Sequence, residues 1–210
     1  MKTLLVANPK GGSGKTTLAT NLAGYFAGLG WHVVLSDMDR QKSALKWLAT
    51  RPVRLPFVNA LNGRGDHLIS LSADINIIDS PAGLRGEKLK DAVKAADWII
   101  VPIQSSVFDI VATEKFLDVL RAEKSVRKSK TFVLMVGMRI GARTKSAAML
   151  EKYLDAAGFP VTAHLSDAQI YKESAETGFS IFDMPASKAS KHKSQWLALI
   201  QSLKVHHKNN

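Results

Sequence analysis

A glycine-rich segment near the start of the chain has the composition of a phosphate-binding loop. Residues 8–17 read NPKGGSGKTT, directly after a short apolar run and directly before a helical pattern. Glycines leave room for backbone N–H groups and a helix N-terminus to surround phosphate oxygens. In loops of this kind a lysine, here Lys15, reaches the outer phosphates, and a hydroxyl, here Thr16, binds Mg²⁺. The segment therefore predicts a site for a nucleotide and Mg²⁺.

Two acidic segments that follow apolar runs could complete this site. HVVLSDMDRQ places Asp37 and Asp39 at the end of its apolar run, and INIIDSPAG places Asp79 in the same position. Mg²⁺ accepts carboxylate oxygens as ligands, and Gly83 would let the backbone approach a terminal phosphate. An acid pair after a strand is by itself more often a helix cap or a solvated turn. Beside a phosphate loop we interpret the three carboxylates as parts of one site.

The elements that must position these residues alternate along the chain. The predicted strands are Thr3–Asn8, His32–Ser36, Ile75–Asp79, Trp98–Ile103, Thr131–Gly137 and Val161–Leu165. Amphipathic helical patterns lie between them, such as the one with Leu18, Leu22 and Phe26 on one face. Apolar strands separated by helices indicate an α/β fold, a doubly wound and mostly parallel sheet with helices on both faces, in three layers α/β/α. Active sites of such sheets lie at the carboxyl ends of the strands, and the stretch Arg51–Gly65, rich in Pro, Gly and Arg, is expected to be an exposed excursion.

The form of the phosphate loop is typical of one group of ATPases. The plain pattern G-x-x-x-x-G-K-[ST] fails because Pro9 stands at its first glycine, whereas the residues from Lys10 to Thr16 fit K-G-G-x-G-K-[ST]. That is the deviant Walker A motif of the ParA and MinD group of P-loop NTPases, which the chain resembles. The resemblance implies ATP as the nucleotide. It also implies that Lys10 acts across a dimer like an arginine finger, because an ammonium there can cancel phosphate charge.

The resemblance also implies roles for the other site residues. DMDRQ resembles the family's D-x-D-P-Q switch, with Arg40 in place of the proline, so that Asp39 would orient the attacking water and Asp37 would lie nearer the metal. DSPAG resembles the family's Walker B motif and its D-x-P-x-G sequel, so that Asp79 would hold the metal through water. The predicted catalytic residues are Lys10, Lys15 and Asp39, and the predicted metal ligands are Thr16, Asp37 and Asp79. The predicted nucleotide-binding residues are Lys10, Gly11, Gly12, Ser13, Gly14, Lys15, Thr16, Thr17, Gly83, Met138, Arg139, Met184 and Pro185, the last two in a segment that resembles the family's adenine-side loop.

The resemblance extends over almost the whole chain. The run ADWIIVPIQ followed by Asp109 looks like the segment after the third ParA motif, with Ser105 and Val107 in place of two prolines. The chain enters its first strand at once, as in the small ParF-like branch, so we expect one ATPase domain over residues 1–210 and no separate N-terminal DNA-binding domain. The middle of the chain looks similar to the carboxysome-positioning, McdA-like subgroup. Plasmid, chromosome, chemoreceptor cluster and carboxysome all remain open as cargo.

In proteins of this kind ATP builds a sandwich homodimer, and the dimer binds DNA without sequence preference. A ParB-like or cargo adaptor protein then stimulates slow hydrolysis of ATP to ADP and phosphate. The resemblance therefore implies a partition or positioning ATPase whose partners are a second copy of itself, non-specific DNA and such an adaptor. It also implies a cytoplasmic protein that associates with the nucleoid when ATP is bound.

The distribution of charge agrees with a polyanionic partner without requiring one. The net charge is +11, and residues 121–152 hold nine Lys and Arg against two acids, while residues 188–210 hold five Lys and no acid. Such an excess forms either a polyanion-binding surface or a solvated face. The candidate DNA contacts are Arg127, Lys128, Lys130, Arg143, Lys145, Lys188, Lys191 and Lys193.

Two alternative functions have signals of their own. Trp196, Leu199, Ile200 and Leu203 form an apolar stripe near lysines, which in MinD-like relatives would grip a membrane, but the spacing favours a helix packed on its own sheet. A metabolic P-loop enzyme is the other alternative. The chain has no cysteine for an iron–sulfur cluster and no motif for a second small substrate. Its apolar runs are too short for a signal peptide or a membrane span.

Overall fold

One parallel sheet organises the part of the chain that the structure describes. In this computed structural model the described residues are 1–61, 72–140, 148, 150, 152–153 and 156–203. The strands are β1 (Lys2–Val6), β2 (Val33–Asp37), β3 (Val58–Leu61), β4 (Ile75–Asp79), β5 (Trp98–Gln104), β6 (Phe132–Ile140) and β7 (Val161–Ser166). Their order across the sheet is β3-β2-β4-β1-β5-β6-β7, and every neighbouring pair is parallel.

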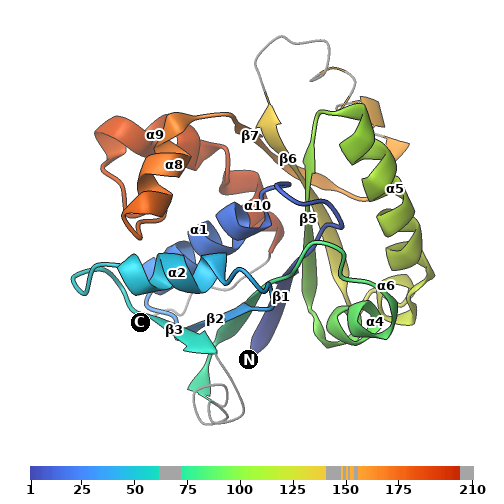
Figure 1. The fold of residues 1–210 in the computed structure, drawn as a ribbon, viewed down its shortest axis with the longest axis horizontal. Coiled ribbons are helices and arrows are strands. Elements are labelled where there is room, and N and C mark those ends of the chain that lie inside the picture. The colour runs from blue at the N-terminus through green and yellow to red at the C-terminus, as the bar shows by residue number, and fades with distance from the viewer. Residues whose placement is uncertain (62–71, 141–147, 149, 151, 154–155, 204–210) are drawn as a thin grey trace.

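Helices cover both faces of the sheet, which gives the predicted three layers (Figure 1). One face carries α1 (Lys15–Gly28), α2 (Ser43–Thr50), α8 (Gln169–Glu176), α9 (Ala186–Ser194) and α10 (Leu197–Ser202). The opposite face carries α4 (Gly86–Ala95), α5 (Val107–Ala122) and α6 (Lys124–Arg127). Two hydrophobic clusters, one on each side, therefore share the sheet.

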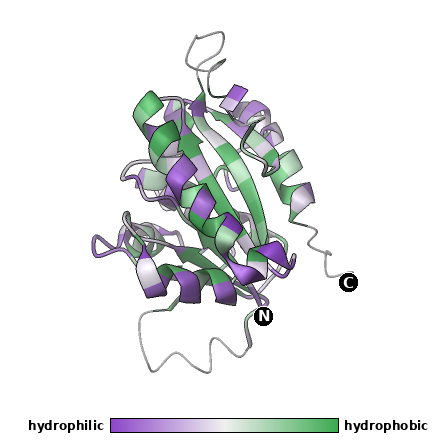
Figure 2. Ribbon diagram, turned by 90° about the vertical axis from the view of Figure 1, so that its right-hand side faces the viewer, coloured by the Kyte–Doolittle hydropathy of each residue, from purple (hydrophilic) through white to green (hydrophobic). Residues whose placement is uncertain are grey.

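The alternation of side chains along each strand explains how one sheet supplies both clusters. Leu4 and Val6 of β1 belong to the cluster under α1, whereas Leu5 belongs to the cluster under α5, and all three are fully buried. Successive side chains of a strand point to opposite faces, so a strand buried on both sides is apolar throughout. Figure 2 shows largely hydrophobic strands and helices that mix hydrophobic and hydrophilic residues.

The six predicted strands are all present, but the expectation for Arg51–Gly65 was partly wrong. β3 lies within that stretch and pairs with β2 at the edge of the sheet. Val58, which is 1% exposed, packs into the cluster under α1 and α2, so burial outweighs the turn-forming residues around it.

The C-terminal apolar stripe packs against the protein itself, as predicted. Trp196, Leu199 and Leu203 are fully buried in the cluster on the α1 side, and α10 lies against β7. Within the described part of the chain, each helix is too short or too polar to span a bilayer.

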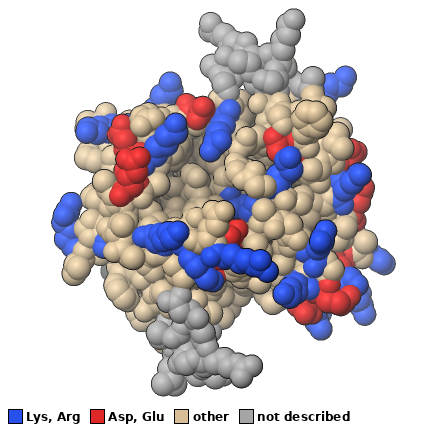
Figure 3. Space-filling model, viewed as in Figure 1, with Lys and Arg blue, Asp and Glu red and all other residues tan. Residues whose placement is uncertain are grey.

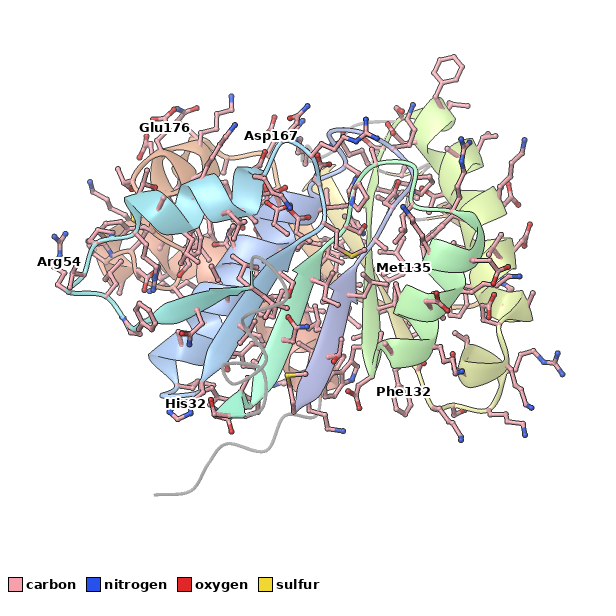
Figure 4. All side chains as sticks on the ribbon, turned by 60° about the horizontal axis from the view of Figure 1, so that its bottom comes forward. His32, Arg54, Phe132, Met135, Asp167 and Glu176 are labelled. Atoms are coloured by element: carbon pink, nitrogen blue, oxygen red, sulfur yellow. The ribbon has the colours of Figure 1, made fainter. Side chains whose placement is uncertain are left out.

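The parallel strands bring all their carboxyl ends to one edge of the sheet, here called the carboxyl edge. Asp37 ends β2 and Asp79 ends β4, and the two are direct partners in the register of these strands. Figure 4 shows His32 and Phe132 at the opposite, amino edge, and Asp167, which follows β7, near the carboxyl edge. The predicted site residues therefore meet because the strands are parallel.

Candidate nucleotide site

The loop between β1 and α1 has a backbone that needs glycine. Gly12 and Gly14 have φ angles of 72° and 102°, in the left-handed region that other residues rarely adopt. A Cβ on Gly14 would also lie 2.6 Å from the terminal carbon of Met138. The side-chain amide of Gln104 donates to the carbonyl of Gly12 at 2.5 Å and ties the loop to β5.

The first turn of α1 leaves its backbone N–H groups for a ligand. No side chain caps the helix, which begins at Lys15, and no acidic residue lies in its first turn. The first N–H groups of a helix have no partner within the helix and carry partial positive charge. An anion at this position would satisfy them.

Lys15 is folded back onto the loop. Its side-chain nitrogen donates to the carbonyl of Lys10 at 2.8 Å, and the residue is 7% exposed. Burial lowers the pKa of Lys15, while Asp79 and Asp39 act in the opposite direction. A buried ammonium near a short loop is a ready partner for a phosphate, which would replace the carbonyl and the lost hydration.

Thr16 and Asp79 form the pair that fits a metal ion. The Thr16 hydroxyl donates to one carboxylate oxygen of Asp79 at 2.7 Å. The other oxygen, Oδ1, is buried without a hydrogen-bond partner among the described residues. Burial raises the pKa of Asp79 to about 6, against the effect of the Thr16 hydrogen bond and with a smaller contribution from Asp37. An unpaired carboxylate oxygen beside a hydroxyl is a fitting ligand set for Mg²⁺, which commonly takes one or two protein ligands together with phosphate oxygens and water.

Asp37 uses its carboxylate differently from Asp79. One oxygen accepts the backbone N–H of Asp39 at 2.9 Å, and the other accepts those of Ala44 at 2.9 Å and Leu45 at 3.3 Å. The predicted metal ligand thus binds the segment that follows it along the chain. No group of three or more His, Cys, Asp or Glu suited to a metal occurs among the described residues.

A cavity of about 310 Å³ opens between the loop and the acidic segments. The residues around it are Gly11, Gly12, Ser13, Gly14, Lys15, Thr16, Thr17, Asp39, Gln41, Ser43, Ser80, Ala82 and Arg139. The structure therefore brings Asp39 to the phosphate loop, as predicted. It also places Gly83 there, because the Gly83 N–H donates to the carbonyl of Pro9 at 3.1 Å.

A family model matches the part of the chain that contains this site. The model of the CobQ/CobB/MinD/ParA nucleotide binding domain matches residues 4–181, which is most of the chain. The chain belongs to this family.

Named relatives agree with the ParA/MinD resemblance. The maintenance of carboxysome distribution protein A (McdA) of Halothiobacillus neapolitanus is 24% identical over 198 residues, covering 88% of this chain and 88% of that protein. The chromosome-partitioning ATPase Soj of Thermus thermophilus is 31% identical over 143 residues, which span 51% of this chain and 57% of Soj.

Solved structures confirm the fold. Apo McdA from Cyanothece has a TM-score of 0.74 at 17% identity, covering 95% of this chain and 99% of that chain. The MinD cell division protein of Aquifex aeolicus has a TM-score of 0.73 at 18% identity, with full coverage of both chains. The predicted α/β fold of the ParA/MinD type is therefore correct.

The additional lysine of the ParA/MinD loop has a free side chain. Lys10 is half-buried, and it makes its hydrogen bonds through backbone atoms: its carbonyl accepts the Lys15 ammonium, and its N–H donates to the Asn8 side chain at 2.8 Å. Its ammonium makes no hydrogen bond or ion pair with another described residue. The side chain is thus available to a group outside the subunit.

A smaller cavity of about 150 Å³ continues from the loop toward β6 and β7. It is lined by Gly14, Thr17, Met138, Arg139, Leu165, Ser166, Asp167, Ala168, Tyr171, Lys172 and Ala175. The structure therefore brings two of the predicted nucleotide-binding residues, Met138 and Arg139, next to the phosphate loop. The β7–α8 connection supplies residues there that the sequence did not single out.

Met184 and Pro185, in the predicted adenine-side segment, line neither of these two cavities. Met184 packs against the core on the α1 side, and its carbonyl accepts the Lys193 ammonium at 2.8 Å. Nearby Ser180 contacts Gly24, where a Cβ would lie 2.3 Å from the Ser180 hydroxyl. Gly24 is ten residues beyond Gly14, roughly 15 Å along α1. The packing of this segment on the later turns of α1 explains why it does not reach the cavities.

The described candidates for DNA contacts lie on two sides of the sheet. Arg127, Lys128 and Lys130 are exposed at and just after α6, on one side of the sheet, whereas Lys188 and Lys191 are exposed on α9, on the other. Figure 3 shows Lys and Arg in several separate groups over the visible face, with acids beside some of them. The described candidates thus lie on two sides of the sheet, and their contacts with DNA stay a prediction.

Two further details limit the predicted set of basic contacts. The Lys193 ammonium donates to the carbonyls of Phe182 and Met184, at 3.0 and 2.8 Å, and so stabilises its own loop. Arg143 and Lys145 lie outside the described residues.

Ser80 is a site residue that the motifs did not indicate. It lines the larger cavity, and its buried hydroxyl has no hydrogen-bond partner in the described part of the chain. Its position directly after Asp79 was the available signal, because the residue that follows a strand-ending carboxylate reaches the same edge.

Proposed function

We propose that this protein is a ParA-like ATPase that binds ATP between two copies of itself, binds DNA without sequence preference and positions a cargo. The observation that carries the proposal is Lys10, whose ammonium makes no hydrogen bond or ion pair with another described residue. It belongs to the loop whose cavity is lined by Lys15, Thr16 and Asp39, and Thr16 in turn donates to Asp79. Each subunit thus holds the groups expected for binding phosphates, and the Lys10 ammonium is available to a second subunit.

Within a subunit the residues have separable tasks. The loop N–H groups and Lys15 bind the phosphates, and Asp39 orients a water molecule toward the terminal phosphate. Mg²⁺, held by the Thr16 hydroxyl and the Asp79 carboxylate, would neutralise phosphate charge when bound. Lys10 of a second copy would stabilise the charge that develops during transfer.

The cargo is proposed from the relatives. McdA is named for carboxysome distribution and Soj for chromosome partitioning, so we infer a positioning role with a protein adaptor that stimulates hydrolysis. Association with the nucleoid would follow from DNA binding. Membrane cycling is less well supported, because Trp196, Leu199 and Leu203 are buried against the sheet.

The experiment compares Lys10→Ala with Lys115→Ala, a change at an exposed lysine of α5. Molar mass in solution, ATP hydrolysis and binding to a random-sequence DNA duplex are measured with ATP and with ADP. Because the Lys10 ammonium makes no hydrogen bond or ion pair with another described residue, the Lys10 variant should still bind ATP while losing the dimer, hydrolysis and ATP-dependent DNA binding. The Lys115 variant should behave as the wild type.

Each part of the proposal can fail separately. A Lys10→Ala protein that still dimerises with ATP would remove Lys10 from its role across the interface. A wild-type protein that binds ATP but not DNA would support a nucleotide-binding protein and refute the proposed DNA binding. A wild-type protein that does not bind ATP would overturn the whole proposal.

A further inference from the structure

The carboxylate of Asp37 closes a loop that spans residues 37 to 45. Asp37 ends β2, is 5% exposed, and accepts backbone N–H groups on both oxygens, from Asp39 on one and from Ala44 and Leu45 on the other. A carboxylate offers about four lone-pair positions, and three are directed at this segment. The contrast with Asp79, its neighbour in the sheet, is direct, because one oxygen of Asp79 has no partner among the described residues.

The contacts at the start of α2 explain why this loop needs the carboxylate. The residue before the helix is Lys42, whose side chain makes no cap, and no acidic residue lies in the first turn. The first N–H groups of a helix require an acceptor. Asp37 supplies it from seven residues upstream, at the position of Ala44.

Lys42 ties the same loop from its other end. Its φ angle of 54° is rare for a residue with a side chain, and its ammonium donates to the carbonyl of Asp37 at 2.5 Å. The loop is therefore held from both ends. The Asp37 carboxylate, at the end of the strand, binds the first turn of α2, and the Lys42 ammonium, just before α2, binds the last carbonyl of the strand.

The loop carries the residues that face the nucleotide cavity. Asp39, Gln41 and Ser43 line that cavity, whereas Asp37 does not. Within the loop, Asp39 accepts the N–H of Gln41 at 2.9 Å, and the N–H of Met38 donates to the carbonyl of Asp79 at 2.9 Å. The position of the Asp39 carboxylate therefore depends on contacts that Asp37 holds in place.

We propose that Asp37 and Lys42 are positioning residues that hold the Asp39 loop over the nucleotide cavity, and that Asp37 does not ligate the metal. The inference rests on the proposed ATPase function for the role of Asp39. The contacts by which Asp37 and Lys42 hold residues 37–45, here called the clamp, are a property of the nucleotide-free fold. A Lys42 variant tests the positioning of the loop without removing a metal ligand, because an ammonium cannot be a ligand of Mg²⁺.

The test uses Asp37→Asn and Lys42→Met, with Asp79→Asn as the variant of a metal ligand and Lys115→Met as a surface control. Three quantities are measured: hydrogen exchange of residues 38–45 without nucleotide, the Mg²⁺ concentration that half-saturates ATP binding, and the rate of hydrolysis. Asparagine keeps an acceptor oxygen, so the Asp37 variant retains a partial cap and should fold.

The clamp predicts that both variants behave alike. Exchange of residues 38–45 should be faster, the Mg²⁺ requirement should stay within about twofold of the wild type, and hydrolysis should fall by about 10- to 100-fold, the effect of a small misplacement of a reacting group. Asp79→Asn should instead raise the Mg²⁺ requirement without faster exchange at 38–45.

If Asp37 is a metal ligand, the Asp37 and Lys42 variants should differ from each other. If Asp37→Asn raised the Mg²⁺ requirement as Asp79→Asn does, while Lys42→Met resembled the wild type, Asp37 would be a ligand and the clamp would be wrong. If the wild type neither bound nor hydrolysed ATP, the proposed function would fail. The exchange measurement would then still decide whether Asp37 and Lys42 hold the loop.

Discussion

Replacing Arg51 with methionine should destabilise the fold strongly, because Arg51 forms a buried ion pair. Its guanidinium contacts Asp183 through two nitrogens, at 2.8 and 3.2 Å, and the two side chains are only 4% and 6% exposed. One guanidinium nitrogen also donates to the carbonyl of Gly178 at 3.1 Å. The pair therefore joins the end of α2 to the connection between α8 and α9.

The magnitude follows from the carboxylate that would be left behind. Removing one partner of a buried pair costs about 3–5 kcal/mol, since the other charge stays buried and uncompensated. Asp183 would keep two donors, the N–H and the hydroxyl of Ser180 at 2.7 and 2.6 Å, so we expect the lower end, about 3 kcal/mol. For a chain of this length that corresponds to a fall in the melting temperature of about 6–12 °C.

The assay is urea and thermal unfolding of Arg51→Met, Asp183→Asn and the double variant. Removing both charges should cost clearly less than the sum of the single changes, because no unpaired charge remains. Lys90→Met breaks an exposed pair with Glu87, whose side chains are 53% and 81% exposed, and should leave the unfolding midpoint unchanged. An Arg51→Met protein as stable as the Lys90 variant, or strictly additive single changes, would refute this account of the pair.

Two further predictions concern protons and DNA. Burial raises the pKa of Asp79 to about 6 from about 4 in an unfolded chain, so this group's contribution to stability is present below about pH 4 and is lost as the pH rises through 6. Asp79→Asn cannot ionise and should melt above the wild type at pH 8 but not at pH 4, and an advantage independent of pH would contradict this. The DNA prediction rests on the proposed ATP-dependent dimer and on the positions of two groups of lysines on opposite sides of the sheet. If α9 carries the DNA contacts, reversing Lys188 and Lys191 to Glu should weaken ATP-dependent DNA binding and reduce its salt slope by about 0.9 for each phosphate that is no longer neutralised, whereas reversing Lys128 and Lys130 should not. The opposite ranking in a salt series would assign the DNA contacts to the side that carries α6.

The parts of the site that the sequence predicted well depend on local geometry or on strand register. The spacing of Gly12, Gly14, Lys15 and Thr16 determines a loop that leads into a helix, whatever surrounds it. Thr16 and Asp79 are 63 positions apart, yet apolar runs ending in polar residues were enough to bring them together. Parallel strands place such ends at one edge, so knowing that the sheet was parallel was nearly sufficient.

The parts that the sequence did not predict depend on contacts between distant segments. The adenine-side expectation for Met184 and Pro185 was based on likeness alone, and their place is decided by Ser180 fitting against Gly24 and by Lys193 holding the loop carbonyls. Counts of charge likewise cannot tell on which side of a sheet a helix lies. The sequence therefore could not show that the candidate lysines near α6 and those on α9 lie on opposite sides.

α2 connects the nucleotide site to the C-terminal half of the protein through contacts at both of its ends. Asp37 holds its first turn, and Arg51, directly after its last turn, is paired with Asp183. Between them the Trp47 indole N–H donates to the carbonyl of Phe179 at 3.0 Å. Because all three contacts involve buried groups, a displacement of the Asp39 loop must either break one of them or move α2 together with the segment that leads into α9. The unfolding of Arg51→Met and the exchange of residues 38–45 therefore measure the two ends of one connection, which runs from the proposed water-orienting carboxylate to the helix that carries Lys188 and Lys191.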